Sequence, residues 1–279
     1  MNDDASADAK LAHMQDILRS LKRVAVAFSA GVDSTFVLKV AADTLGAENV
    51  LAVTAKSESL PGAEFDQARQ LADSIGVELV VIQTNEFDNP LYLTNPVDRC
   101  YHCKNDLYEK IAKLAADRGF RAILSGTNAD DYADYRPGMR AAHEHDVHSP
   151  CAEAGMSKSD IRTLSRQLGL PTHDKPAMPC LASRVPYGQP ITPEKMHQID
   201  QAETYLRSLG FEPCRVRHHG NMARIELAAE DIQQATEPQN RNKIDAAFRK
   251  LGFNYVAIDL RGFRTGSLNE ILNPKSPDG

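Results

Sequence analysis

The 279-residue chain lacks any apolar run that approaches the length of a membrane span, although 42% of its residues are hydrophobic. It also lacks an excess of positive charge, because the formal net charge is −6, and this disfavours nucleic-acid binding. Residues 1–8 are polar and acidic and lack the pattern of a signal peptide, so we expect them to be disordered. The sequence therefore predicts a soluble, cytoplasmic protein without membrane or nucleic-acid partners.

Cysteine is sparse, with five residues, which in a cytoplasmic chain suggests metal or redox chemistry before disulfides. Cys100 and Cys103 form a Cys-x-x-Cys motif at a predicted helix start, and Cys180 lies in a loop rimmed by prolines. Three interpretations stay open: a zinc site completed by His102 or Cys180, a redox dithiol, and an iron–sulfur cluster held by three cysteines. The other two cysteines have no such partner.

One stretch combines a strand, a loop of small residues and a helix. Residues 24–28 form an apolar, β-branched run, and residues 36–45 carry apolar side chains at helical spacing. The loop amides and the N-terminus of the helix converge on one point, where the helix dipole favours negative charge. Gly31 lets the backbone come close, two serines offer hydroxyl groups, and Asp33 could hold Mg²⁺ against a phosphate. This pattern predicts phosphate binding.

The chain has no Gly-x-x-x-x-Gly-Lys-Ser/Thr motif, so the loop is not of the Walker type. It resembles instead the pyrophosphate loop, Ser-Gly-Gly-x-Asp-Ser, of the N-type ATP pyrophosphatases, which cleave ATP to AMP and pyrophosphate. Ala30 replaces the first glycine, a change that a negative φ would tolerate. The alternative is an ordinary turn capped by Asp33 or Ser34. The predicted pyrophosphate-binding residues are Ser29, Ala30, Gly31, Val32, Asp33 and Ser34.

The fold class follows from the order of the remaining elements. Further strands at residues 50–54, 78–82 and 121–125 alternate with helices at residues 63–75 and 104–118. Strands that alternate with helices predict an α/β fold with a doubly wound parallel sheet, in which ligands bind at the carboxyl ends of the strands.

Polar loops follow two of these strands. Residues 54–59 could hold the adenine and ribose of a nucleotide, or form an ordinary polar connector. Residues 126–131, Gly-Thr-Asn-Ala-Asp-Asp, offer a close backbone approach and carboxylates, or a capped turn, since Asn and Asp are common in turns. Two such loops at one sheet edge favour a nucleotide–Mg²⁺ site. The expected nucleotide ligands are Thr54, Ser57, Gly126, Asn128 and Asp131.

The second half predicts a small α+β domain for substrate binding and oligomerisation. A helix is expected to start at Thr192-Pro193, and another is expected over residues 232–250. Arg215 and Arg217 alternate on one face of a strand, and Arg264 follows the last strand. Convergent arginines suit a phosphate or carboxylate, whereas the alternative is solvated charge at a strand edge. The predicted boundaries are residues 1–18 for an acidic tail and leading helix, 19–186 for an ATP pyrophosphatase domain and 187–272 for the C-terminal domain.

The motifs together resemble the LarE family of ATP-dependent sulfur transferases, which build the nickel-pincer nucleotide cofactor. The resemblance covers nearly the whole chain. It rests on the loop at Ser29, the Gly126–Asp131 box, Pro179-Cys-Leu-Ala-Ser-Arg184, Arg215-Val-Arg-His-His219 and Arg264-Thr-Gly-Ser267. It implies that the protein adenylates a carboxylate of pyridinium-3,5-biscarboxylic acid mononucleotide and replaces the activated oxygen with sulfur.

The resemblance also implies ATP, Mg²⁺ and a [4Fe–4S] cluster as cofactors. Some members donate sulfur from one cysteine at the position of Cys180, which becomes dehydroalanine. Others carry two further cysteines and hold a cluster that carries the transferred sulfur. The chain resembles the second kind, with Cys100, Cys103 and Cys180 as ligands.

Further roles follow from the same resemblance. The catalytic residues would be Cys180, Asp33, Ser34 and Arg184, and the substrate phosphate would be held by Arg215, Arg217, Arg264 and Glu203. A homo-oligomer is expected, with nickel-insertion and carboxylase enzymes of the pathway as candidate partners. The alternatives are a sacrificial Cys180, a tRNA thiolase, an NAD synthetase-like ligase and a non-catalytic nucleotide- or metal-binding module. The negative net charge argues against the tRNA thiolase, and the three cysteines argue against the ligase, because a reaction with ammonia needs none.

Overall fold

The computed structural model describes residues 2–60, 62–133, 137–176, 178–264 and 266–271. Thr265 of the arginine motif, and residues 1 and 272 at the ends of the expected domains, lie outside that range. The chain divides into two compact units. The first comprises Met1–Tyr92 and Asp98–Met178, and the second comprises Leu93–Val97 and Pro179–Gly279.

The first unit is built on a parallel sheet with the strand order β3-β2-β1-β4. The central strand β1 (Val24–Ala27) pairs on one side with β2 (Val50–Lys56) and on the other with β4 (Ala122–Leu124). Strand β3 (Glu78–Gln83) pairs with the outer side of β2. This arrangement confirms the predicted parallel sheet, whose strands all end at one edge.

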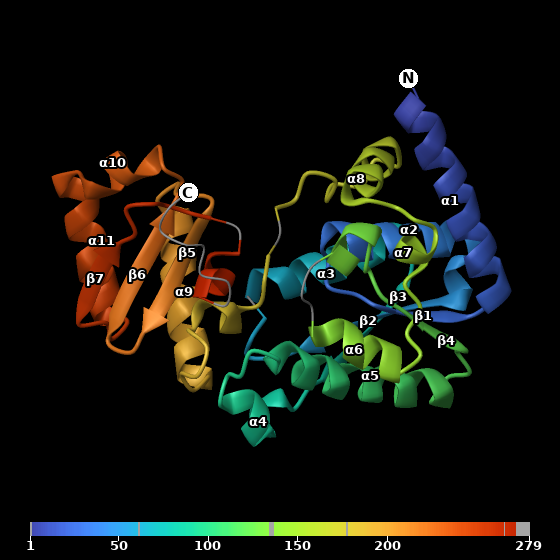
Figure 1. Cartoon of the computed structure of the whole chain (residues 1–279), viewed down its shortest axis with the longest axis horizontal. Coiled ribbons are helices and arrows are strands. Elements are labelled where there is room, and N and C mark those ends of the chain that lie inside the picture. Colours follow the sequence, from blue (N-terminus) through green and yellow to red (C-terminus); the bar gives the residue numbers. More distant parts are fainter. Residues whose placement is uncertain (1, 61, 134–136, 177, 265, 272–279) are drawn as a thin grey trace. The chain divides into compact units, whose positions relative to one another are not determined.

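Successive residues of the strands face two separate apolar cores, and helices cover both faces of the sheet. Val24 and Val26 pack in the core of α1, α2, α3, α7 and α8, whereas Ala25 packs with α5 and α6. Figure 1 shows α2 and α5 on opposite sides of the sheet. The helices are α1 (Asn2–Leu21), α2 (Val32–Leu45), α3 (Gly62–Ile75), α4 (Pro90–Leu93), α5 (Arg99–Asp117), α6 (Pro137–Glu144), α7 (Pro150–Glu153) and α8 (Lys158–Gln167).

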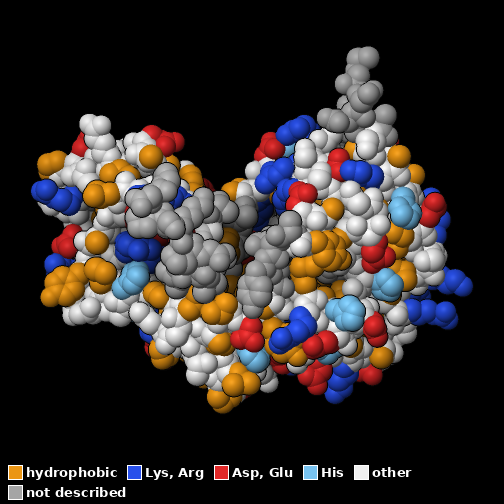
Figure 2. Space-filling model, in the orientation of Figure 1, with side chains coloured by type: hydrophobic (Ala, Val, Ile, Leu, Met, Phe, Trp, Pro, Cys, Tyr) orange, Lys and Arg blue, Asp and Glu red, His pale blue; other side chains and the backbone are white. Residues whose placement is uncertain are grey.

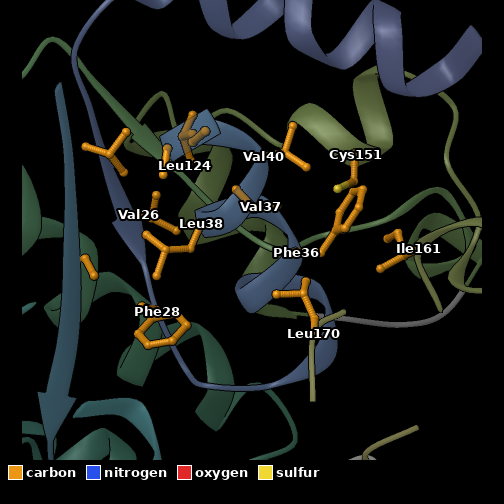
Figure 3. Packing of buried hydrophobic residues seen from close by; sticks show 14 of the residues in the cluster. Val26, Phe28, Phe36, Val37, Leu38, Val40, Leu124, Cys151, Ile161 and Leu170 are labelled. Carbon is orange, nitrogen blue, oxygen red and sulfur yellow. The ribbon is translucent and has the colours of Figure 1, made fainter. Parts of the chain in front are cut away.

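Helix α2 packs into the first core along most of its length. Phe36, Val37 and Leu38 are fully buried, and Figure 3 shows the ring of Phe36 beside Cys151 and near Ile161. Cys151 is itself fully buried, and this burial raises the pKa of its thiol. Cys151 is therefore a packing residue of the first core. Packing fixes the direction of α2 and, with it, the loop at its N-terminus.

The acidic N-terminal residues are part of a helix, contrary to the expected disorder. Helix α1 begins at Asn2 and runs without a break to Leu21. Ala7, Met14 and Leu18 are buried in the first core and anchor it. Once a helix is nucleated by tertiary packing, each further residue adds one hydrogen bond, so the polar end extends it.

Helix α5 also begins earlier than predicted. It starts at Arg99, with Asp98 at the N-cap, rather than at Lys104. Cys100 and Cys103 therefore lie inside the first turns of the helix, and not in a loop before it.

The second unit pairs β5 (Cys214–His219) and β6 (Met222–Leu227) antiparallel, and β7 (Tyr255–Ile258) runs parallel to β6. Side chains from the sheet and its helices form one apolar core. The helices are α9 (Pro193–Ser208), α10 (Asp231–Thr236) and α11 (Pro238–Lys250). In Figure 1 the three strands, α10 and α11 are coloured orange to red. A single helix was expected near residues 232–250. Pro238 divides it, because the residue before proline is disfavoured in helical conformation.

Charged side chains of both signs are interspersed over the visible face of each unit (Figure 2). None of the helices in the described part of the chain is long and apolar enough to cross a membrane. The cytoplasmic location stays a prediction.

Candidate functional site

The predicted phosphate loop connects the carboxyl end of β1 to α2. Gly31 is the N-cap of α2 and has extended backbone, and no side chain caps the helix there. Ser34 Oγ lies 3.1 Å from Ser29 Oγ and accepts a hydrogen bond from the Ser29 amide at 3.3 Å. The two hydroxyls therefore close the loop beside a helix N-terminus, where the amides and the dipole favour an anion.

Ala30 departs from the expected backbone conformation. Its φ is +55°, in the left-handed region that favours glycine, and not negative as a tolerated methyl group would require. For a residue with a Cβ this conformation costs about 1–2 kcal/mol. The side chain is fully buried in the first core, and burial of one methyl group recovers about 0.8 kcal/mol. Packing therefore offsets part of the strain of an alanine in this position.

Asp33 projects from the first turn of α2 and forms an ion pair that the sequence analysis missed. Its Oδ2 accepts a hydrogen bond from Lys158 Nζ at 2.6 Å, across 125 residues of sequence. Its Oδ1 is buried without a hydrogen-bond donor among the described residues. A carboxylate oxygen without a donor is a suitable ligand for Mg²⁺, so the residues present fit the expected metal.

Gly126, which follows β4, lies directly against the start of α2. A Cβ atom at this position would lie 2.8 Å from the Ser34 amide nitrogen and 3.2 Å from Asp33 Cβ. The close approach that the sequence predicts is thus an approach to the backbone of the phosphate loop. Only glycine fits there, and it fixes one strand-end loop against another.

We expect Gly126→Ala to displace the start of α2 and to lower AMP formation by about a hundredfold, because small misplacements of reacting groups have effects of this size. The measurement is AMP release from ATP in the presence of substrate. Gly155→Ala is the control, since an added Cβ at Gly155 has no atom within 4 Å, even though Gly155, unlike Gly126, has a positive φ. Equal rates for both variants would contradict the role of Gly126.

The Gly126–Asp131 box forms a capped turn. Asp131 Oδ2 accepts from the Asn128 amide at 3.0 Å, and Asn128 Oδ1 accepts from the Asp130 amide at 3.0 Å. Asp130 Oδ2 accepts from the amide of Lys158, the first residue of α8, at 2.8 Å. The box therefore positions α8, and nucleotide binding by Asn128 and Asp131 stays a prediction.

The loop after β2 is held by a buried carboxylate that sequence reasoning missed. Thr54 is buried near the end of β2. Ser57 and Ser59 both donate hydrogen bonds to Glu86 Oε1, and Glu86 is 2% exposed. Glu86 follows β3, so two neighbouring strand ends are tied together. The expected contacts of Thr54 and Ser57 with adenine or ribose stay predictions.

Lys175 is a second basic residue at the phosphate loop that no motif indicated. Its Nζ donates to the Ala30 carbonyl at 3.1 Å, to Glu64 Oε2 at 2.7 Å and to Gln67 Oε1 at 2.5 Å. These three acceptors use all three protons of the ammonium group. Lys175 therefore stabilises the strained loop at Ala30 from the side of α3.

The cysteines predicted to bind metal divide between the two units. Cys100 and Cys103 lie three residues apart on α5, in the first unit, and Cys180 lies in the second. None of the three is in a disulfide, and their side chains are exposed or half-buried. The helical spacing puts the first two on one face, which suits a shared metal or cluster. Over the residues that the structure describes, no three His, Cys, Asp or Glu side chains gather closely enough to hold a metal, so the three-cysteine site stays a prediction.

Arg184, predicted to be catalytic, is fully buried and organises the Cys180 loop. Its guanidinium donates to the carbonyls of Pro179 at 2.7 Å and Cys180 at 3.2 Å, and to Ser183 Oγ at 2.9 Å. It also forms a two-pronged ion pair with Glu203 at 2.8 and 3.0 Å. These contacts hold the backbone of the Cys180 loop, and the predicted catalytic role of Arg184 stays a prediction.

Glu203 is engaged in the same buried network. Its Oε1 accepts both Arg184 Nε and the amide of Val216 on β5. Burial alone would raise the pKa of this carboxyl, but Arg184, the nearby charge of Arg215 and the hydrogen bond from the Val216 amide together lower it. A carboxylate would repel a phosphate directly, so the predicted part of Glu203 in phosphate binding could only be indirect.

Arg217 and Arg264, which are predicted to bind the substrate phosphate, are each paired with a carboxylate. Arg217 binds Glu226 at 3.0 and 2.8 Å, in a buried pair that Ser267 joins. Arg264 binds Glu270 at 2.9 Å, and that hydrogen bond raises its pKa. Their charges are therefore largely balanced within the protein.

Arg215 has a different environment. It is 6% exposed, and its guanidinium lies 5.1 Å from the centre of the Phe263 ring. Burial, and after it the nearby positive charge of Arg184, lowers its pKa to about 10. Its Nη1 donates to the Cys214 carbonyl at 2.7 Å, and phosphate binding by Arg215 stays a prediction.

A parallel sheet with a phosphate loop after its first strand, braced by glycine from a neighbouring strand end, defines an ATP pyrophosphatase domain of the NAD synthase type. The NAD synthase family model matches residues 13–98, which include β1, the loop and α2.

Relatives that match over nearly the full length of the chain identify its family within this class of ATP-using enzymes. The chain is 45% identical over 265 residues to an uncharacterised protein of Synechocystis, covering 95% of this chain and 98% of the relative. It is 40% identical over 268 residues to the pyridinium-3,5-bisthiocarboxylic acid mononucleotide synthase of Lactiplantibacillus plantarum, covering 96% of each. An argininosuccinate synthase of Halobacterium salinarum is 29% identical over 147 residues, covering 48% of this chain and 36% of the relative. The chain therefore belongs to the LarE family, that of the Lactiplantibacillus synthase, and is an ATP-using enzyme of the PP-loop type.

Proposed function

We propose that this enzyme uses ATP to activate a carboxylate of pyridinium-3,5-biscarboxylic acid mononucleotide and then replaces oxygen with sulfur, giving the thiocarboxylate. The observation that carries the proposal is the loop from Ser29 to Ser34, with its hydroxyls and Asp33 at the N-terminus of α2. The synthase relative, 40% identical over nearly the whole chain, supports the choice of substrate.

The chemistry needs activation because a carboxylate resists nucleophilic attack. One carboxylate oxygen attacks the α-phosphorus of ATP, the bond to the bridging oxygen breaks, and pyrophosphate leaves from an acyl adenylate. Sulfur supplied as hydrosulfide adds to the acyl carbon, and AMP departs with the electron pair of the C–O bond. The loop amides and Ser34 would bind the pyrophosphate. Asp33 would hold Mg²⁺, which offsets charge on the leaving group.

The sulfur source has two candidates. Cys100, Cys103 and Cys180 would hold a [4Fe–4S] cluster, which when bound carries the sulfur for transfer. Alternatively, Cys180 Sγ attacks the acyl carbon itself. AMP leaves, and removal of the Cys180 α-proton then breaks the Cβ–S bond, leaving dehydroalanine and the thiocarboxylate. In either case Arg184 holds the backbone of Cys180 in place.

Other expectations from the sequence remain predictions. They are a homo-oligomer, action with nickel-insertion and carboxylase enzymes, and a substrate-binding role for the C-terminal domain. A ligase of the NAD synthetase kind is the second candidate, because the NAD synthase family model covers the phosphate loop.

The proposed function is tested by incubating anaerobically purified enzyme with ATP, Mg²⁺ and the biscarboxylic mononucleotide. AMP and pyrophosphate are expected in equal amounts, and mass spectrometry should show oxygen replaced by sulfur when a sulfur source is present. AMP formation that requires nicotinic acid adenine dinucleotide and ammonia instead would favour the ligase. A protein that forms no AMP with either substrate would be a binding module.

Arg215→Met is expected to weaken binding of the mononucleotide about tenfold or more, because a charge-assisted hydrogen bond to phosphate contributes roughly 1.5–3 kcal/mol. Binding of ATP should be unchanged. Calorimetric titration with each ligand measures both. Arg261→Met is the control, since Arg261 is an exposed arginine of the same unit. If Arg215→Met binds the mononucleotide as the wild type does, Arg215 is not its phosphate ligand.

A further inference from the structure

Lys175 is fixed in place through both its backbone and its side chain. Its carbonyl accepts a hydrogen bond from Arg162 Nη2 of α8 at 2.9 Å, and its amide donates to the Thr172 carbonyl at 3.0 Å. Its ammonium donates to Glu64 Oε2 at 2.7 Å, and the side chains of this ion pair are only 13% and 11% exposed. The ammonium group is therefore held at a defined position beside the phosphate loop.

The ammonium of Lys175 has no proton left for a phosphate. The Ala30 carbonyl, Glu64 and Gln67 each accept one of its three hydrogen bonds, and the Glu64 carboxylate balances its charge. Any effect of Lys175 on a bound nucleotide must therefore pass through the groups that it holds. Of these, Ala30 belongs to the phosphate loop.

The hydrogen bond to Ala30 sets the direction of a loop amide. The peptide unit between Ala30 and Gly31 is planar and trans, so the Ala30 carbonyl and the Gly31 amide point in opposite directions. Gly31 is the N-cap of α2, where the first amides have no acceptor within the helix and no side chain caps the end. Because Lys175 holds the carbonyl, the Gly31 amide points away from the lysine and can join the amides that favour an anion.

This orientation of the peptide requires a backbone conformation that alanine rarely adopts. The φ of Ala30 is +55°, where the Cβ atom of any residue except glycine is crowded. If nothing held the Ala30 carbonyl, a smaller fraction of molecules would have the loop in this conformation. The apparent affinity for a ligand of the loop would fall by the same factor.

We propose that Lys175 is a positioning residue for the ATP reaction, which holds the Ala30–Gly31 peptide so that the Gly31 amide can donate a hydrogen bond to the pyrophosphate portion of ATP. The inference rests on the proposed use of ATP at the Ser29–Ser34 loop. Lys175 itself contacts no phosphate oxygen in this role. Its contribution should therefore depend on whether residue 30 is alanine or glycine.

The test is a double-mutant cycle of Lys175→Met and Ala30→Gly. Lys175→Met also leaves Glu64 without its cation, but this effect is common to both backgrounds and cancels in the cycle. Binding of inorganic pyrophosphate without Mg²⁺ is measured by calorimetry, and KM and kcat for ATP are measured from AMP release. Lys10→Met is the control, because Lys10 forms an ion pair with Asp160 at 2.7 Å elsewhere in the same unit.

We expect Lys175→Met to weaken pyrophosphate binding about tenfold and to raise the KM for ATP, because the strain at Ala30 is no longer offset. In the Ala30→Gly background, the same substitution should weaken binding less than about threefold, since glycine adopts a positive φ without this strain. Lys10→Met should bind pyrophosphate as the wild type does. If thermal unfolding shows that Lys175→Met does not fold, the pair Lys175→Met and Glu64→Gln replaces it in both backgrounds.

Equal weakening by Lys175→Met in both backgrounds would overturn the inference, because the lysine would then act independently of the Ala30 peptide. Wild-type affinity in Lys175→Met would overturn it too. Either result leaves the proposed function standing as long as the wild-type enzyme binds ATP and pyrophosphate. A wild-type enzyme that binds neither would overturn both.

Discussion

Replacement of Asp33 by asparagine is expected to lower AMP formation roughly a thousandfold, because the metal charge that a carboxylate holds contributes several kcal/mol to the transition state. Asparagine has nearly the same shape, so the phosphate loop should keep its conformation. The apolar residues that anchor α2 lie on other positions of the helix and are untouched. The fold should therefore persist, with a loss of stability within about 1 kcal/mol from the altered helix end.

The measurement is the rate of AMP release over a range of Mg²⁺ concentrations. Asp43→Asn is the matched control, because Asp43 is another aspartate of α2 that pairs with a lysine, Lys39, at the opposite end of the helix. It should leave the rate unchanged. AMP production by Asp33→Asn at the wild-type rate would contradict the assignment of this loop as the site that binds Mg²⁺ and pyrophosphate.

Loss of Cys180 is expected to abolish sulfur transfer whether the sulfur comes from a cluster or from Cys180 itself. Variants of Cys100 and Cys103 distinguish these two sulfur sources. If the three thiolates hold a cluster, Cys100→Ser and Cys103→Ser should each lose bound iron and repeated turnover. If Cys180 gives its own sulfur, both variants should stay active. Cys214→Ala serves as the control, because this cysteine is buried in the core of the second unit.

The enzyme is reconstituted anaerobically with iron and sulfide, and iron content, number of turnovers and intact mass are then measured. Retained iron, many turnovers and an unchanged mass would support the cluster. A colourless protein that turns over once and loses the mass of one H₂S, with Cys100→Ser and Cys103→Ser fully active, would establish the sacrificial route. Formation of AMP should continue in all these variants, since the phosphate loop is separate in sequence.

The sheet and the phosphate loop were predictable because their signals are local. The apolar run of β1 and the helical spacing after Phe36 lie within one short stretch, and neighbouring residues alone specify them. Burial of β1 on both faces explains why its apolar run is continuous rather than alternating. The capped start of α9 at Thr192 followed in the same way from two adjacent residues.

The side chains around the loop could not be predicted, because their partners are distant in sequence. The pairs Lys158–Asp33 and Arg217–Glu226 depend on how helices and strands pack, and a lone lysine or glutamate carries no motif. The positive φ of Ala30 was also missed, since it reflects tertiary contacts that override the local preference of alanine. The arginines were identified as a group, but only the structure shows which carboxylates they already bind.

The short segment Leu93–Val97 makes the two units inseparable by a single cut. Although residues of the first unit flank it on both sides, the side chain of Asn95 donates to the carbonyls of Val185 at 3.1 Å and Pro186 at 2.7 Å within the second unit. A protease that cleaved after Met178 would leave this anchor on the N-terminal fragment and its partners on the C-terminal one. The nicked protein should run as two bands under denaturing conditions and as one particle under native ones, and neither fragment should be expected to behave as an independent domain when expressed alone.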